Sequence, residues 1–158
     1  MKHEIYTNQT GKFPVASRRG HKYLMIMCKL DINKIIVETM KTKTEEEMIS
    51  THQNLLNRLK ERVVKTKRHI LNNEISDAYK EKIKGNGIQY ELLSSGMQLR
   101  NLSGKRIKNN FKGHFKSLLC RVDNSFQLEL WGRIIKQTEM KINLLWQANK
   151  TLKVSAYA

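Results

Sequence analysis

The sequence predicts an α+β fold in which one mixed sheet carries helices on its faces. A continuous apolar run from Leu24 to Cys28 lies between turn signals and is typical of a central strand buried on both faces. The short polar segment 31–33 after this run suits a hairpin connection. Further along the chain, helical and strand patterns alternate, which favours a mixed sheet with helices packed against it.

Three strands are expected in the first quarter of the chain, at about residues 3–7, 23–30 and 35–39. Turns around 10–12 and 31–33 separate them, so the strands form an antiparallel meander. This pattern is shared by many α+β domains and does not by itself indicate a function.

The later elements follow from hydrophobic periodicity and from turn residues. Thr44 and Glu47 have the spacing of a capping box, and Gly85 or Gly87 is expected to end a second helix. We expect His52 at the surface or boundary of the first helix, and Trp131 as a packing residue. The expected elements are a helix at 45–63, a strand at 67–71, a helix at 75–84, a strand at 88–93, and helices at 102–121 and 126–148.

Composition bounds the class of protein. The 158 residues suit one domain, and the formal net charge of +16 favours a polyanionic partner, with nucleic acid as the first candidate. No apolar run approaches the roughly 20 residues of a membrane span, and the chain begins with strand-like sequence rather than a secretory signal. Cys28 and Cys120 lie in apolar stretches, which favours buried thiols, an intracellular chain and no metal site.

The segment from Tyr6 to Gly11 reads YTNQTG. It resembles the start of a retroelement integrase catalytic core, where the family has tyrosine-threonine-aspartate-glutamine-threonine-glycine at the end of its first strand. The aspartate is the first metal ligand of that family, and Asn8 stands at its position.

The resemblance continues over nearly the whole chain and is greatest to integrases of retrotransposons. The segment 70–74 reads ILNNE and resembles the leucine-aspartate-asparagine-glutamate of the family, which puts Asn72 at the second metal-binding position. Arg100 and Asn101 resemble the start of the arginine-asparagine-alanine-alanine-glutamate helix, so counting three residues further puts Gly104 at the third. A register shift of one would move this position to residue 103 or 105.

This resemblance implies a ribonuclease H-like fold, with an antiparallel meander of three strands plus two further strands in a five-stranded sheet. In the family, Mg²⁺ or Mn²⁺ supports DNA cleavage and strand transfer, in which two cations stabilise the attacking and leaving oxygens. Asn8 and Asn72 are neutral and Gly104 has no side chain, so the chain as written is expected to be inactive and to hold no metal. Glu74 lies nearby, but one carboxylate does not hold two metals.

The helix expected at 102–121 is strongly basic and lacks acidic residues. One interpretation is a surface that contacts the DNA phosphate backbone, and the other is a solvated helix face. The candidate nucleic-acid-binding residues are Arg100, Lys105, Arg106, Lys108, Lys112 and Lys116, with Arg121 at the end of the helix.

We therefore expect residues 1–158 to form a single integrase-core-like domain, as a fragment of a longer polyprotein. The alternatives are a non-catalytic module, derived from an integrase, that binds nucleic acid or protein, and a decayed relic without a selected function. Family resemblance also implies homo-oligomers and, if the family role is retained, a nuclear location.

Overall fold

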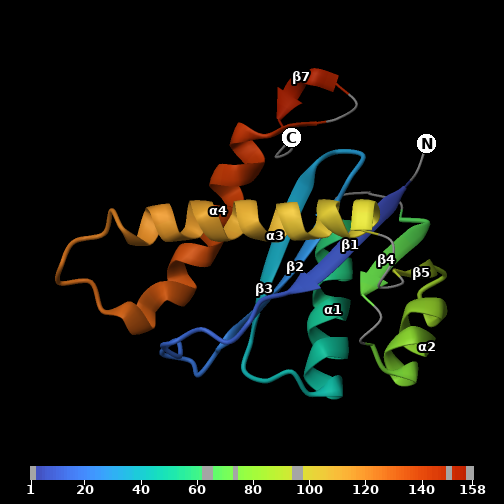
Figure 1. Cartoon of the computed structure of the whole chain (residues 1–158), viewed down its shortest axis with the longest axis horizontal. Coiled ribbons are helices and arrows are strands. Elements are labelled where there is room, and N and C mark those ends of the chain that lie inside the picture. Colours follow the sequence, from blue (N-terminus) through green and yellow to red (C-terminus); the bar gives the residue numbers. More distant parts are fainter. Residues whose placement is uncertain (1–2, 62–65, 73–74, 94–97, 149–150, 156–158) are drawn as a thin grey trace.

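A five-stranded mixed sheet forms the centre of the chain (Figure 1). The computed structural model describes residues 3–61, 66–72, 75–93, 98–148 and 151–155. The strands are β1 (Glu4–Gln9), β2 (Tyr23–Lys29), β3 (Lys34–Met40), β4 (Arg68–Asn72) and β5 (Gln89–Leu93), in the spatial order β3-β2-β1-β4-β5. β1, β2 and β3 are antiparallel neighbours, whereas β4 and β5 run parallel to β1. The predicted fold class, a meander plus two further strands, is confirmed.

Helices cover both faces of this sheet. The helices are α1 (Glu45–Lys60), α2 (Asp77–Gly85), α3 (Gln98–Leu119) and α4 (Trp131–Leu145), with a 3₁₀ turn at Leu128–Leu130. α1 and α2 pack on one face, and α3 and α4 pack on the other (Figure 1). Two short strands, β6 (Gln147–Ala148) and β7 (Thr151–Ser155), form a separate small sheet that the sequence patterns did not predict.

Successive side chains of β2 point to opposite faces of the sheet, which explains why the core has two parts. Met25 and Met27 point toward α1, while Leu24 and Ile26 point toward α3 and α4, so the apolar run is buried on both faces as predicted. The second face is aromatic, with Phe111, Phe115 and Trp131 buried in it.

Helix α4 closes the open edge of β3. The side-chain amide of Asn143 accepts a hydrogen bond from the Ile35 N–H (2.8 Å) and donates one to the Ile35 carbonyl (2.7 Å). Two residues along, the Val37 N–H donates to the Glu139 carboxylate (2.8 Å). Arg58 of α1 donates to the Val37 carbonyl and pairs with Glu139. These side chains form hydrogen bonds with the backbone N–H and C=O groups of β3, which an uncovered edge strand would offer to another chain.

The predicted capping box is wrong. Thr44 is the N-cap of α1, but its side chain makes no capping hydrogen bond. The Glu47 carboxylate instead accepts hydrogen bonds from the main-chain N–H groups of Lys41 and Thr42, because the loop before the helix folds back over it. A side-chain cap is found on α2, where Ser76 accepts a hydrogen bond from the Tyr79 N–H.

Two helix boundaries also differ from the predictions. α3 begins at Gln98 rather than 102, since the helix-favouring residues Gln98 and Leu99 extend it. The last helix begins only at Trp131, because Asp123 holds a turn by accepting from the Ser125 N–H, and a 3₁₀ turn follows. As expected, Gly87 follows the second helix with a left-handed φ of 72°.

Two burial predictions are wrong as well. His52 is fully buried, since it faces the sheet together with Leu55 and Leu59. Cys28 is buried, and burial raises the pKa of its thiol to about 12, but Cys120 is exposed just after α3. Within the part of the chain that the structure describes, no helix is long and apolar enough to cross a bilayer.

Candidate functional site

The carboxyl ends of β1 and β4 bring two of the predicted site positions together. The two strands are parallel neighbours, with Tyr6 opposite Ile70. Two residues further along each strand are Asn8 and Asn72, the latter being the last residue of β4. Adjacent strands lie about 4.8 Å apart, so these two positions are neighbours at one end of the sheet. The side chain of Asn72 lies outside the described residues.

Helix α3, which packs on one face of the sheet, supplies the third predicted position. A Cβ atom at Gly104 would lie 3.9 Å from Nδ2 of Asn8 and 3.8 Å from Cδ1 of Tyr6. These are ordinary van der Waals distances, so residue 104 faces the end of β1 and has room for a side chain. Lys105 is exposed instead. The structure thus brings all three predicted triad positions to the same end of the sheet.

The residues present there do not fit a two-metal centre. The donors are neutral amides where Mg²⁺ prefers carboxylates, and Gly104 contributes no donor at all. The gap between β1 and α3 has a volume of about 10 Å³, near the lower limit for one water molecule. In the described segments, no group of three or more His, Cys, Asp and Glu residues could hold a metal ion. Glu74 lies outside the described residues.

A buried histidine pair lies on the other face of the sheet and is bonded to Thr7, the residue before Asn8. Thr7 Oγ1 and His69 Nε2 share a hydrogen bond of 2.6 Å, and His69 Nδ1 is 3.1 Å from His52 Nε2. The two imidazole rings stack with centroids 4.7 Å apart, and the edge of Tyr79 packs against His52.

Burial lowers the pKa of His52 to about 4. Burial, and then the neighbouring His52, lowers the pKa of His69 well below its ordinary value. Both rings are therefore neutral at pH 7. The sequence carried a signal for this pair, because His52 falls in the same helical stripe as Met48, Leu55 and Leu59.

Among the described residues, the lysines of α3 form a basic surface that begins next to Gly104. Lys105, Lys108, Lys112 and Lys116 follow a spacing of three and four residues and share one helix face. Burial, followed by the charges of Lys112, Lys105 and Lys43, lowers the pKa of Lys108 below its ordinary value. We call Lys43, from the loop between β3 and α1, together with Lys105, Lys108 and Lys112 of α3, the lysine ridge.

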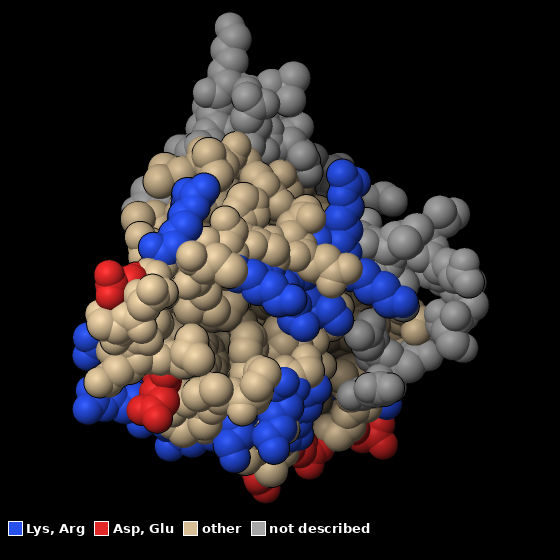
Figure 2. Space-filling view, turned by 60° about the vertical axis from the view of Figure 1, so that its left-hand side comes forward, with Lys and Arg blue, Asp and Glu red and all other residues tan. Residues whose placement is uncertain are grey.

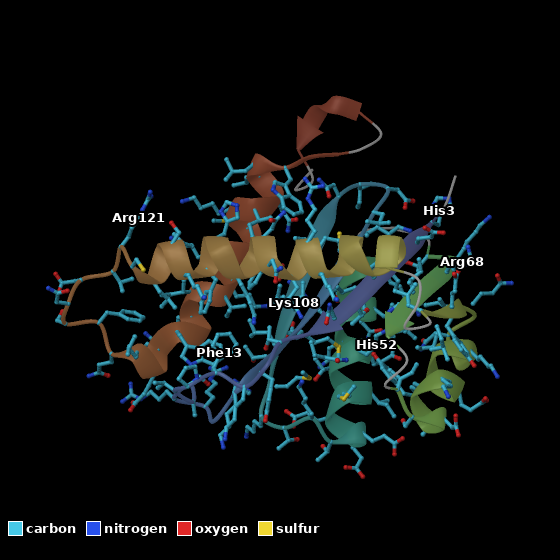
Figure 3. The ribbon with its side chains drawn as sticks, in the orientation of Figure 1. His3, Phe13, His52, Arg68, Lys108 and Arg121 are labelled. Atoms are coloured by element: carbon cyan, nitrogen blue, oxygen red, sulfur yellow. The ribbon has the colours of Figure 1, made fainter. Side chains whose placement is uncertain are left out.

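Other predicted basic residues lie away from this ridge. Arg106 is exposed on a different side of α3, and Arg121 lies beyond its end. In Figure 3, Lys108 lies near the middle of α3, whereas Arg121 lies just past the carboxyl end of the helix. Figure 2 shows Lys and Arg side chains in several separate groups on one face, with acidic side chains toward its margins. The side chain of Arg100 is outside the described residues.

Comparisons with known proteins bear on the fold. No protein-family model matches the sequence, and no curated protein matches it. The structure is similar to the catalytic core domain of BIV integrase, with a TM-score of 0.66 and 9% identity over 92% of this chain and 86% of that one. It is also similar to a chain of the simian T-cell lymphotropic virus intasome in complex with PP2A regulatory subunit B56 gamma.

The match to the intasome chain has a TM-score of 0.65, with 14% identity over 91% of this chain. The similar region spans about half of the intasome chain, 49% of its length. Identities this low support a shared fold and leave the chemistry to the residues of each chain. The chain therefore has the ribonuclease H-like fold of a retroviral integrase catalytic core.

Proposed function

We propose that this chain is a non-catalytic DNA-binding domain with an integrase-core fold. The lysine ridge carries the proposal. Its ammonium groups lie close enough for Lys43, Lys105 and Lys112 to lower the pKa of Lys108, after the larger effect of burial. A cluster of like charges on a folded surface stores repulsion that a polyanion relieves.

The expected ligand is the phosphate backbone of duplex DNA. Three of the four ridge lysines lie on one face of α3 and can follow a row of phosphates. Such contacts position DNA without reading its sequence. Each neutralised phosphate releases counterions, so affinity depends steeply on salt. The ridge also lies beside position 104, where the family resemblance implies that DNA is held.

We further propose that the domain descends from a retrotransposon integrase and has lost strand transfer. The YTNQTG segment and its asparagine support this origin, together with Asn72 and Gly104 at the other ligand positions. An intact reverse transcriptase in the flanking reading frame would support a living element and a nuclear role. Stop codons there would support a relic.

The DNA-binding experiment is a titration of duplex DNA at several salt concentrations. If about four phosphates are neutralised, the slope of log K against log salt is about −3.6. Replacing Lys105, Lys108 and Lys112 by Gln should bring the slope close to −0.9, since about three contacts are lost. The matched control replaces Lys60, Lys82 and Lys84, exposed lysines of α1 and α2, by Gln. Binding that is flat in salt, or equally weakened in both variants, contradicts the proposal.

The catalytic experiment restores the acidic residues. Asn8→Asp, Asn72→Asp and Gly104→Glu together should create binding of Mg²⁺ or Mn²⁺, and we expect none in the unmodified chain. The control keeps both aspartates and moves the glutamate to Gly113, which lies on the same helix in open space. We expect calorimetric metal binding with Gly104→Glu and weaker binding with Gly113→Glu. Metal-dependent strand transfer by the unmodified chain would overturn the proposed loss of catalysis.

A further inference from the structure

A cavity of about 470 Å³ opens at the edge of the sheet, between the β1–β2 connection, β3 and the start of α4. Its size falls in the range of small-ligand sites. It is separate from the gap at Gly104, and no residue of the lysine ridge lines it. The charged and titratable lining residues are Arg18, Arg19, His21, Glu38, Glu129, Arg133 and Lys136.

The cavity is lined by four cations and two carboxylates, Glu38 and Glu129, which leaves a formal charge of +2 with His21 neutral. Arg18, Arg19 and Arg133 form no ion pair with any described residue, and all three are exposed residues that line the cavity. Lys136 is 3.8 Å from Glu38. Glu38 is held more closely from outside the cavity by Arg58, at 2.9 Å, which leaves little of its charge to neutralise the arginines.

The two walls of the cavity are fastened to each other. The Arg18 N–H donates a hydrogen bond of 2.7 Å to the carbonyl of Glu129, and Trp131 Nε1 donates one of 2.9 Å to the Val15 carbonyl. Phe13 stacks on Trp131 with ring centroids 4.7 Å apart. The backbones that carry the arginines are therefore positioned before any ligand arrives, which lowers the entropy cost of binding.

We propose that this cavity binds a multiply charged phosphate group. The arginines come from two elements, Arg18 and Arg19 from the connection and Arg133 from α4, so a ligand between them meets guanidinium groups from both sides. Guanidinium groups bind phosphate oxygens in a bidentate manner, and several of them suit a dianion or polyphosphate better than one carboxylate.

A neutral imidazole adds a polar group to the same wall. Burial, and then the charge of Lys41, lowers the pKa of His21. Arg19 lowers this pKa as well, while Glu47 and Glu38 raise it by less than the total lowering. Two sources supply this chemistry, a free nucleotide and a terminal phosphate of a nucleic acid. The inference stands apart from the lysine ridge and does not require it.

The experiment titrates the full chain with pyrophosphate by calorimetry. Arg18→Gln with Arg133→Gln should weaken binding by about tenfold for each arginine, the change expected for losing a charge-assisted hydrogen bond. The matched control, Arg106→Gln with Arg121→Gln, removes two exposed arginines outside the cavity and should leave the affinity unchanged. Thermal melting verifies that all variants fold.

Further titrations identify the source of the phosphate. Tighter binding of adenosine triphosphate than of pyrophosphate supports a free nucleotide. Preference for a duplex with a 5′-phosphate over one with a 5′-hydroxyl, lost with Arg133→Gln, supports a nucleic-acid end. The Lys105, Lys108 and Lys112 variant should retain pyrophosphate binding even if it loses DNA, which separates the two proposals.

Three results would overturn the proposal. One is no pyrophosphate binding by the unmodified chain, and another is equal affinity in the Arg18→Gln/Arg133→Gln variant. The third is competition by polyglutamate as strong as that by pyrophosphate at equal salt, which would show a general site for acidic groups.

Discussion

The two faces of the sheet each bury polar side chains, but they satisfy them differently. On the α4 side, the amide of Asn143 both donates to and accepts from Ile35, so its two polar atoms are paired. On the α1 side, Thr7, His69 and His52 form a chain of hydrogen bonds that stops at His52 Nδ1, which has no hydrogen-bond partner among the described residues.

The difference shows what a buried polar group contributes. The Asn143 amide pairs with both the N–H and the C=O of Ile35, as a neighbouring strand would. These two hydrogen bonds hold α4 against β3. A network that ends in an unpaired nitrogen carries a desolvation cost and responds to protons. The α4 side should therefore be sensitive to substitution, and the α1 side to pH.

The largest effect is expected for Asn143→Asp. The carboxylate cannot donate to the Ile35 carbonyl and places an unpaired charge at a site where Asn143 is 2% exposed. We expect a loss of about 3–5 kcal/mol in the free energy of unfolding, measured by chemical denaturation. The control, Asn109→Asp on the exposed side of α3, should change stability by less than about 0.5 kcal/mol. Equal effects in both variants would mean that Asn143 does not hold the β3 edge.

The next effect is an acid-induced loss of stability from the α1 side. Burial lowers the pKa of His52 in the folded chain to about 4, below the ordinary histidine pKa of about 6.5, so protons bind the unfolded chain more tightly. The stabilisation is complete above pH 6.5 and is lost as the pH falls from 6.5 toward 4, amounting to about 3 kcal/mol for His52. His69 acts in the same direction.

Denaturation curves between pH 7 and 4 measure this dependence. His52→Gln removes one titrating ring and keeps a polar group beside His69, so the pH dependence should become shallower. His114→Gln removes a histidine from α3 on the other face and serves as the control. An unchanged slope in His52→Gln would show that the buried pair does not set the acid limit.

The smallest effect is expected on the outer surface of α4. Met140 is 46% exposed, three residues before the buried Asn143. Met140→Gln should change the free energy of unfolding by less than about 0.5 kcal/mol. This result would show that only the inner side of α4 is sensitive to substitution. A loss above about 1 kcal/mol, or a change in association state by light scattering, would show that another surface covers this side.

Local patterns in the sequence were enough to predict the sheet and the place of the candidate site. The apolar run of β2 and the turns around it specify the meander, because alternation and turn chemistry act over a few residues. Asn8 and Asn72 were expected at neighbouring strand ends, and the structure places them there. The helical spacing of Lys105, Lys108 and Lys112 is likewise readable without a structure. DNA binding and the loss of catalysis remain predictions.

The tertiary structure alone decided the features that depend on distant segments. Asn143 meets Ile35 across 108 positions of sequence, and nothing local in α4 distinguishes this amide from an exposed one. His52 is buried against His69 of β4, which in turn shares a hydrogen bond with Thr7 of β1. Glu47 accepts hydrogen bonds from the loop before its helix instead of capping the helix. The arginine-lined cavity exists only where the β1–β2 connection docks on α4. Such contacts arise from chain segments that pack together, and periodicity and propensity describe each segment only by itself.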